Sequence, residues 1–123
     1  MEECESCGIE IVHCRNRQLR KGGEAAEQPA VVVEPGILNG RFNEILAGHG
    51  FWFAPDPASK AISSVGGNIA TNAGGLLCAK YGVTRDAVLG LKVVLADGRL
   101  LDLGHRSVKG VTGFDLTALM VGS

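Results

Sequence analysis

The chain has 123 residues, 46% of them hydrophobic and 20% charged, with a formal net charge of -1. This length allows one domain at most, and the apolar fraction is typical of a folded protein rather than a disordered one. A charge this close to neutral argues against nucleic acid as the main partner, because binding phosphates requires a dense basic surface. We expect no transmembrane segment, and the acidic start Met1-Glu2-Glu3 lacks a secretion signal, so the expected location is cytoplasmic.

Residues 1–30 differ in character from residues 31–123. They show no clear apolar period, and they carry a basic stretch from Arg15 to Lys21 that is followed by Gly22-Gly23. We therefore expect residues 1–30 to form a poorly packed arm or a short irregular helix, with the folded domain in residues 31–123.

The cysteines Cys4, Cys7 and Cys14 lie in this arm. Cys4 and Cys7 have the spacing of half a zinc site, and they are the only feature that favours a small zinc-binding regulatory domain. The other candidate ligands, His13 and Cys14, are adjacent, and adjacent side chains rarely reach one tetrahedral ion together. We expect no metal site, and we interpret the cysteines as thiols in a reducing compartment.

The predicted domain begins with a strand and a helix. Val31–Val33 is β-branched and favours a strand, which Glu34-Pro35-Gly36 would end in a turn. The helix would start at Asn39 as its capping residue and end at Gly48 or Gly50. Its apolar stripe would consist of Phe42, Ile45 and Leu46.

A short aromatic strand is predicted at Phe51-Trp52-Phe53, followed by an extended turn at Pro55-Asp56-Pro57, where each proline fixes its own φ. Ser63–Gly75 predicts a helical turn flanked by irregular loop.

Asp97-Gly98 predicts a hairpin turn. The turn would join a strand with Leu89, Leu91, Val93 and Leu95 on one face to a returning strand with Leu101 and Leu103. A final helix would follow over Leu116, Leu119 and Met120, capped by Asp115. Short strands, a hairpin and short helices together predict an α+β fold class.

The segment from Ser64 to Gly75 carries the strongest chemical signal. Two Gly-Gly pairs bracket the predicted helical turn, and backbone N–H groups at such turns bind anions or ring oxygens. Asn68 and Asn72 supply both donors and acceptors, and Ala73 is small enough for a flat ring to approach the main chain. The alternative is that Gly and Asn only fold a tight surface loop.

An ordered series of motifs extends beyond this segment. It runs from Val33-Glu34-Pro35-Gly36 through Pro55-Asp56-Pro57-Ala58-Ser59 and the Val65–Gly75 segment to Lys80-Tyr81-Gly82, Val94–Gly98 and Lys109–Leu116. The series resembles the PCMH-type FAD-binding domain of the vanillyl-alcohol oxidase and p-cresol methylhydroxylase family. Within that family it is most similar to the branch of FAD-linked glycolate oxidase subunits and D-lactate dehydrogenases.

The resemblance implies a noncovalently bound FAD and a role for each motif. Gly66 to Asn68 would lie near the pyrophosphate and ribityl chain, Asn72 to Gly75 along the isoalloxazine ring, and Tyr81 and Gly82 at the rim of the ring. The Lys109–Leu116 motif would lead toward the adenine. The residues implied to bind the cofactor are Pro55, Asp56, Pro57, Ser59, Ser64, Gly66, Gly67, Asn68, Thr71, Asn72, Ala73, Gly74, Gly75, Tyr81 and Gly82.

The same resemblance implies that the full-length relative oxidises a 2-hydroxy acid to a 2-oxo acid, with a hydride passing to the flavin. We assign no catalytic residue, because the substrate-binding domain of the family lies beyond the stretch matched here. Residues 1–30 do not match the family's upstream Gly-rich pyrophosphate loop, so we expect a fragment that is inactive by itself. The alternative is a non-catalytic remnant or partial module that needs missing segments or a partner, such as other subunits of an oxidase complex.

Some side chains have two interpretations. Cys78 would either approach the flavin ring or act as a small buried hydrophobe, which we favour. Tyr81 would act as an acid or a stacking group, or pack with its hydroxyl satisfied, which we favour. Lys109 would be a surface charge or hold a loop near the cofactor. We expect no catalytic role for His49 or His105, since neither has a carboxylate at a suitable spacing.

Overall fold

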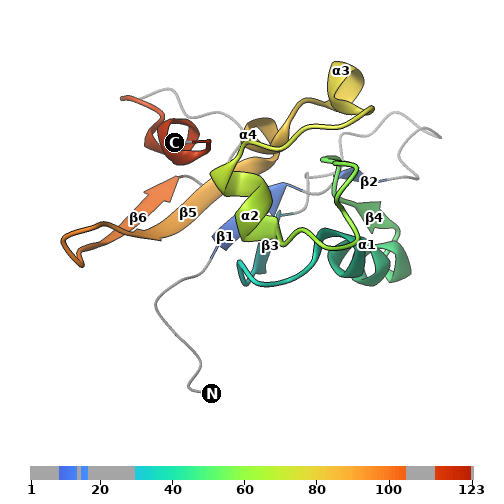
Figure 1. The fold of residues 1–123 in the computed structure, drawn as a ribbon, viewed down its shortest axis with the longest axis horizontal. Coiled ribbons are helices and arrows are strands. Elements are labelled where there is room, and N and C mark those ends of the chain that lie inside the picture. Colours follow the sequence, from blue (N-terminus) through green and yellow to red (C-terminus); the bar gives the residue numbers. More distant parts are fainter. Residues whose placement is uncertain (1–8, 14, 17–29, 105–112, 123) are drawn as a thin grey trace.

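The structure, a computed structural model, describes residues 9–13, 15–16, 30–104 and 113–122. Within these ranges the chain forms a four-stranded antiparallel sheet, a two-stranded ribbon and five helices (Figure 1). The predicted α+β fold class is therefore confirmed. In chain order the elements are β1 Ile9–His13, β2 Arg15–Asn16, β3 Ala30–Val33, α1 Asn39–Gly48, β4 Phe51–Trp52, α2 Val65–Ala70, α3 Cys78–Tyr81, α4 Thr84–Ala87, β5 Val88–Val94, β6 Leu100–Gly104 and α5 Leu116–Met120.

The four-stranded sheet has the order β3-β1-β5-β6, so β1 lies between β3 and β5. The ribbon pairs β2 with β4 and aligns Arg15 with Trp52. For residues 9–13 and 15–16 this differs from the poorly packed arm expected over residues 1–30. The β-branched residues of β1 favour a strand, and neighbours on both sides supply its ladder hydrogen bonds. The division at residue 30 stays a prediction, and Cys4, Cys7 and Cys14 lie outside the described residues.

The hairpin of β5 and β6 has the predicted turn. The register pairs Lys92 with Asp102 and Val94 with Leu100. At its tip Gly98 takes a φ of 83°, a left-handed conformation that glycine adopts without strain, and its N–H donates to the Leu95 carbonyl at 2.9 Å. The Asp97-Gly98 turn is thus confirmed.

The core lies where α1, α2, α4, α5 and β5 meet. The rings of Phe42 and Phe53 pack at 5.4 Å between centroids, and Val65 and Val121 are fully buried. In Figure 1, α2 lies in front of the sheet, and α5 lies beside β5 and β6, which it contacts. The buried apolar cluster consists of Phe42, Leu46, Phe53, Val65, Ile69, Ala87, Val88, Leu91 and Val121.

The two predicted helix caps have different outcomes. Asp115 caps α5 as expected, because its side chain accepts a hydrogen bond from the Ala118 N–H at 2.9 Å. The cap assigned to Asn39 was wrong, since α1 has no side-chain cap and Asn39 is completely buried. The N–H groups of Asn39 and Gly40 donate instead to the carbonyls of Ser63 and Lys60, each at 2.9 Å, so a neighbouring turn replaces the capping side chain.

The predicted apolar stripe of α1 is correct in part. Phe42 and Leu46 are buried, whereas Ile45 is 45% exposed and does not belong to the core. His49 follows the end of the helix and is exposed. The interpretation of Cys78 as a buried hydrophobe was also wrong, because the structure leaves this free thiol exposed on the short helix α3.

Candidate functional site

Two glycines bring the sequence motifs into contact. The Gly66 N–H donates to the Pro35 carbonyl at 2.8 Å, and a Cβ built on Gly66 would lie 2.8 Å from the Cβ of Pro35. A Cβ on Gly75 would overlap the carbonyl of Asp56 and lie 3.1 Å from the nitrogen of Pro57. At both positions the protein's own backbone occupies the space that a side chain would need. These glycines therefore assemble the site, rather than opening it to a ligand.

The loop at Pro55-Asp56-Pro57 is held in place by hydrogen bonds from α1. The Asn39 amide donates to the Pro55 carbonyl at 3.2 Å, and the Asn43 amide donates to the Asn39 side-chain oxygen at 3.1 Å. Pro55 and Pro57 are buried, and the half-buried Asp56 forms an ion pair with Lys60 at 2.7 Å. The backbone of this loop is thus fixed against Gly75. Ser59, the last predicted residue here, is exposed.

The first turn of α2 presents the predicted residues from Ser64 to Asn68. The Ser64 hydroxyl caps the helix by accepting the Gly67 N–H at 3.0 Å, and the Thr71 hydroxyl donates to the Gly67 carbonyl at 3.0 Å. Asn68 is only 2% exposed, and its side-chain nitrogen has no hydrogen-bond partner among the described residues. An unpaired buried donor is costly, which makes Asn68 a candidate for a hydrogen bond to a ligand.

The chain turns sharply after α2 at Asn72, which is not a glycine but has a positive φ of 47°. The turn is held by α4, because the Asn72 side-chain oxygen accepts the Arg85 N–H at 3.0 Å. The Ala73 carbonyl accepts two bonds from Thr84, from its hydroxyl at 2.7 Å and from its N–H at 3.1 Å. Neither Thr84 nor Arg85 was singled out from the sequence.

Several backbone N–H groups in the segment after this turn have no hydrogen-bond acceptor among the described residues. The N–H groups of Gly74, Gly75 and Leu76 donate to no acceptor in the described part of the chain. Gly74 and Gly75 are half-buried and Leu76 is 95% exposed, so a ligand can reach this segment. Successive unpaired N–H groups are suited to anions and ring oxygens.

Tyr81 and Gly82 lie beside the same segment. The Tyr81 ring packs edge-on against Trp52, with 4.9 Å between centroids and an interplanar angle of 88°. Gly82 has a φ of 85°, and a Cβ built on Gly74 would lie 3.4 Å from Val83. The ring contact favours a packing role for Tyr81, although its role toward a cofactor stays a prediction.

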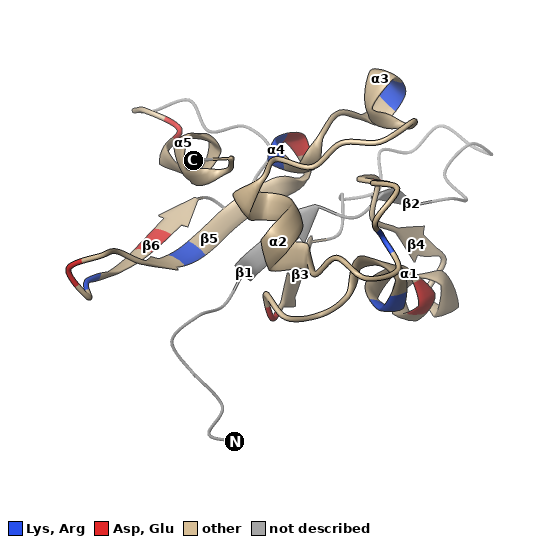
Figure 2. Cartoon of the chain, in the orientation of Figure 1, with Lys and Arg blue, Asp and Glu red and all other residues tan. Residues whose placement is uncertain are grey.

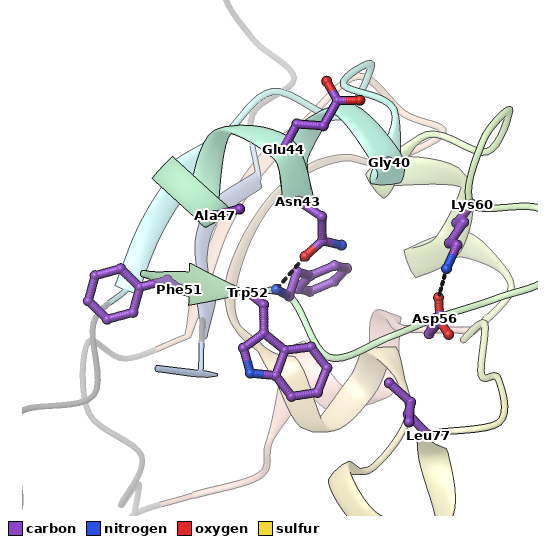
Figure 3. A pocket seen from close by; sticks show the side chains of 10 residues that line it. Gly40, Asn43, Glu44, Ala47, Phe51, Trp52, Asp56, Lys60 and Leu77 are labelled. Carbon is purple, nitrogen blue, oxygen red and sulfur yellow. Dashed lines mark hydrogen bonds and ion pairs between the residues drawn. The ribbon is translucent and has the colours of Figure 1, made fainter. Parts of the chain in front are cut away.

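A cavity of about 520 Å³ opens next to the loop (Figure 3). Of the residues predicted to bind a cofactor, only Asp56 lines it. Figure 3 shows Asn43 between the helix and the strand, with a dashed bond from its oxygen to the Phe53 N–H, a distance of 2.8 Å. The lining consists of Gly40, Asn43, Glu44, Ala47, Phe51, Trp52, Phe53, Asp56, Lys60 and Leu77. The motifs did not indicate this cavity, because most of its lining residues lie on α1 and β4, outside the motifs.

Acidic and basic residues alternate along α1, α4 and the β5–β6 hairpin (Figure 2). Arg41 and Glu44 form an ion pair on α1 at 2.9 Å. Across the described ranges, no group of three or more His, Cys, Asp or Glu side chains is placed to hold a metal ion. His105 and Lys109 lie outside those ranges.

A sequence model of the FAD binding domain family matches residues 10–104. The chain belongs to this family. As an FAD binding domain it has FAD as its cofactor, and the predicted resemblance is confirmed. The match also includes β2 and all of β1 except Ile9, which lie before the domain start that we expected at residue 31.

Curated relatives support this membership. The chain is 46% identical over 97 residues to the glycolate oxidase subunit GlcD of Bacillus subtilis, covering 79% of this chain and 21% of that protein. It is 40% identical to the D-2-hydroxyglutarate dehydrogenase of Stutzerimonas stutzeri, covering 75% and 20%. It is 39% identical to the D-lactate dehydrogenase of Archaeoglobus fulgidus, covering 80% and 22%. The chain thus spans about a fifth of the length of these relatives.

None of the described helices is long and apolar enough to cross a membrane.

Proposed function

We propose that this FAD binding domain holds its cofactor against the surface formed by the Pro55–Ser59 loop and the Ser64–Gly75 segment, with Tyr81 and Gly82 at the rim. One observation carries the proposal. Gly75 packs directly on Asp56, which joins the two segments, while the neighbouring N–H groups lack an acceptor among the described residues. A ligand rich in acceptors would complete this arrangement.

The residues present fit FAD. A flavin offers ring nitrogens and carbonyl oxygens, and its pyrophosphate offers further oxygens, all of which accept hydrogen bonds. The donors available here are the N–H groups of Gly74, Gly75 and Leu76 and the buried side-chain nitrogen of Asn68. The side-chain oxygen of Asn72 is already bonded to α4, so we propose that Asn72 acts on the cofactor through its amide nitrogen and backbone.

When bound, FAD supplies an acceptor for two electrons and a proton in the form of a hydride. The residues of this chain bind and orient it. The buried prolines and the Asn39 bond keep the loop rigid, and the Lys60 ion pair keeps the Asp56 carboxylate at the edge of the cavity. We assign no proton transfer to any described residue.

We further propose that the whole protein oxidises a 2-hydroxy acid to a 2-oxo acid. The relatives are named for glycolate, D-lactate and D-2-hydroxyglutarate, which share a hydroxyl group on the carbon next to a carboxylate. The name of the first relative describes a subunit, so we include other subunits of an oxidase complex as proposed partners.

A second candidate is a partial module that binds FAD only together with further chain or a partner. The observation that favours it is the exposure of large apolar side chains near the site and on the segment before α5. Leu76 is 95% exposed and Phe114 is 96% exposed. Exposed apolar surface of this kind favours association.

Titration of FAD into the purified chain, followed by flavin fluorescence and visible absorbance, tests the proposal. We expect saturable binding that weakens about tenfold or more in Asn72→Asp, because this change keeps the acceptor for the Arg85 N–H but replaces the amide donor with a negative charge. Ala96→Asp adds the same charge on the exposed hairpin and should bind normally. Equal binding by both variants would contradict the proposed site, and binding only after a partner is added would favour the second candidate.

A further inference from the structure

Three segments that are distant in the chain meet at Asn72. The Asn72 side-chain oxygen accepts the Arg85 N–H at 3.0 Å, which joins the end of α2 to α4. The Gly122 N–H donates to the Ile69 carbonyl at 2.9 Å, which joins α2 to the end of α5. The Arg85 guanidinium donates to the Val121 carbonyl at 2.9 Å, which joins α4 to α5. These three bonds close a ring of contacts around the Asn72 turn.

The packing at this junction is tight. Gly122 has a φ of 81°, and a Cβ built on it would lie 2.8 Å from the Cβ of Asn72. Val121, directly before it, is fully buried. The end of α5 therefore lies directly on the left-handed turn, and a shift of one requires a shift of the other.

Electrostatics favour this position of the Arg85 side chain. Carbonyls at the end of a helix lack partners within the helix, and the helix dipole favours a cation there. The guanidinium supplies both a donor and a positive charge to the Val121 carbonyl in a partly buried setting. The contact spans 36 positions in the chain, so it fixes tertiary rather than local structure.

We propose that Arg85 is a positioning residue for the cofactor-binding segment. By tying the Val121 carbonyl to α4, it keeps Gly122 against Asn72 and so sets the direction in which Gly74 and Gly75 leave the turn. This inference rests on the proposed function, because it assigns the effect of Arg85 to the N–H groups that would hold FAD. Arg85 itself does not touch the cofactor in this proposal.

Arg85→Met and Arg85→Lys separate the effect of the hydrogen-bond donor from the effect of the apolar part of the side chain. Methionine keeps much of the apolar stem but removes the donor, and we expect about tenfold weaker FAD binding together with an altered visible spectrum of the bound flavin. Lysine restores a charged donor, and we expect it to recover most of the affinity. Wild-type affinity in Arg85→Met, or an equal loss in both variants, would overturn the proposal.

Gly122→Ala tests the junction from the other side, and Gly98→Ala is its matched control. Both glycines have a left-handed φ, 81° and 83°, but nothing lies within 4 Å of a Cβ built on Gly98. The two substitutions therefore carry a similar backbone cost, and only Gly122→Ala presses on Asn72. We expect FAD affinity to fall about tenfold or more in Gly122→Ala and to stay unchanged in Gly98→Ala. The same affinity in both variants would count against the junction.

Amide hydrogen exchange in the cofactor-free chain tests the role of Arg85 at the junction separately from the proposed binding of FAD. In Arg85→Met we expect faster exchange at Gly122 and at residue 85, whose N–H groups close the ring of contacts, with unchanged exchange in β5. If the wild-type chain binds no FAD, the proposed function fails, and exchange alone decides on the junction. Faster exchange at Gly122 would support it, and exchange equal to the wild type would overturn it.

Discussion

Glycine has different roles in two regions of this molecule. At the site, Gly66 and Gly75 are needed because Pro35 and Asp56 lie where a side chain would be. At the tip of the hairpin, Gly98 has open space around it and is needed only for its φ of 83°. Composition shows the same residue in both regions, but at the site glycine allows close packing, whereas at the tip it only avoids local strain. Substitutions in the two regions should therefore differ in size and in their effect on FAD.

Gly75→Ala should have the largest effect. The new methyl group overlaps the Asp56 carbonyl, so the loop and the Gly-rich segment must separate. We expect the free energy of unfolding to fall by about 3 kcal/mol, the upper part of the range for overpacked sites, with loss of FAD binding. Thermal unfolding followed by circular dichroism and an FAD titration measure the two effects. A stable variant with normal FAD affinity would show that the contact between the two segments is dispensable.

Asn39→Ala should come next, because it removes support from the same loop without adding bulk. The buried Pro55 carbonyl would lose its partner, and the Asn43 amide would keep only its 3.4 Å bond to the Asn39 backbone carbonyl, which together cost about 2 kcal/mol. Glu44→Ala on the exposed side of α1 is the control and should change stability by less than about 0.5 kcal/mol. Denaturant unfolding compares them, and equal midpoints would mean that the Asn39 bond contributes nothing.

Gly98→Ala should have a smaller effect confined to the hairpin. Alanine in a left-handed conformation costs about 1–2 kcal/mol, and here no neighbour is displaced. We expect a lower unfolding midpoint and unchanged FAD affinity. Weaker FAD binding in this variant would remove the distinction between the two regions.

Arg99→Ala should have the smallest effect. Its side chain pairs with Asp97 at 2.7 Å, but the two side chains are 73% and 50% exposed. Water and salt screen such a pair, so we expect a change below about 0.5 kcal/mol at any moderate salt concentration. A larger loss in urea unfolding would show that the pair stabilises the turn itself.

Local signals predicted much of the chain from Val31 onward. The β-branched run, the Asp97-Gly98 turn and the Asp115 cap each depend on a few adjacent residues, and each forms as expected. The strand β1 was missed because its place between β3 and β5 depends on partners far along the chain. The cap at Asn39 was wrong for a related reason, since carbonyls near Ser63 satisfy the helix start.

At the candidate site, the motifs identified the segments but not the contacts between them. That Gly75 packs on Asp56, and that Arg85 reaches Val121, follows only from the tertiary structure. The roles of the individual residues toward FAD stay predictions. The cavity beside Trp52 carried no motif, because aromatic residues in a short strand are typical of a core.

The edge-on contact of Trp52 with Tyr81 has a practical consequence. Trp52 is the single tryptophan of the chain, so its emission reports on one place only, the contact between β4 and α3. Flavins absorb where tryptophan emits, and a cofactor bound next to α3 would quench this emission by energy transfer. The chain therefore contains an intrinsic optical reporter, which would register both the docking of α3 and the arrival of a flavin without any added label.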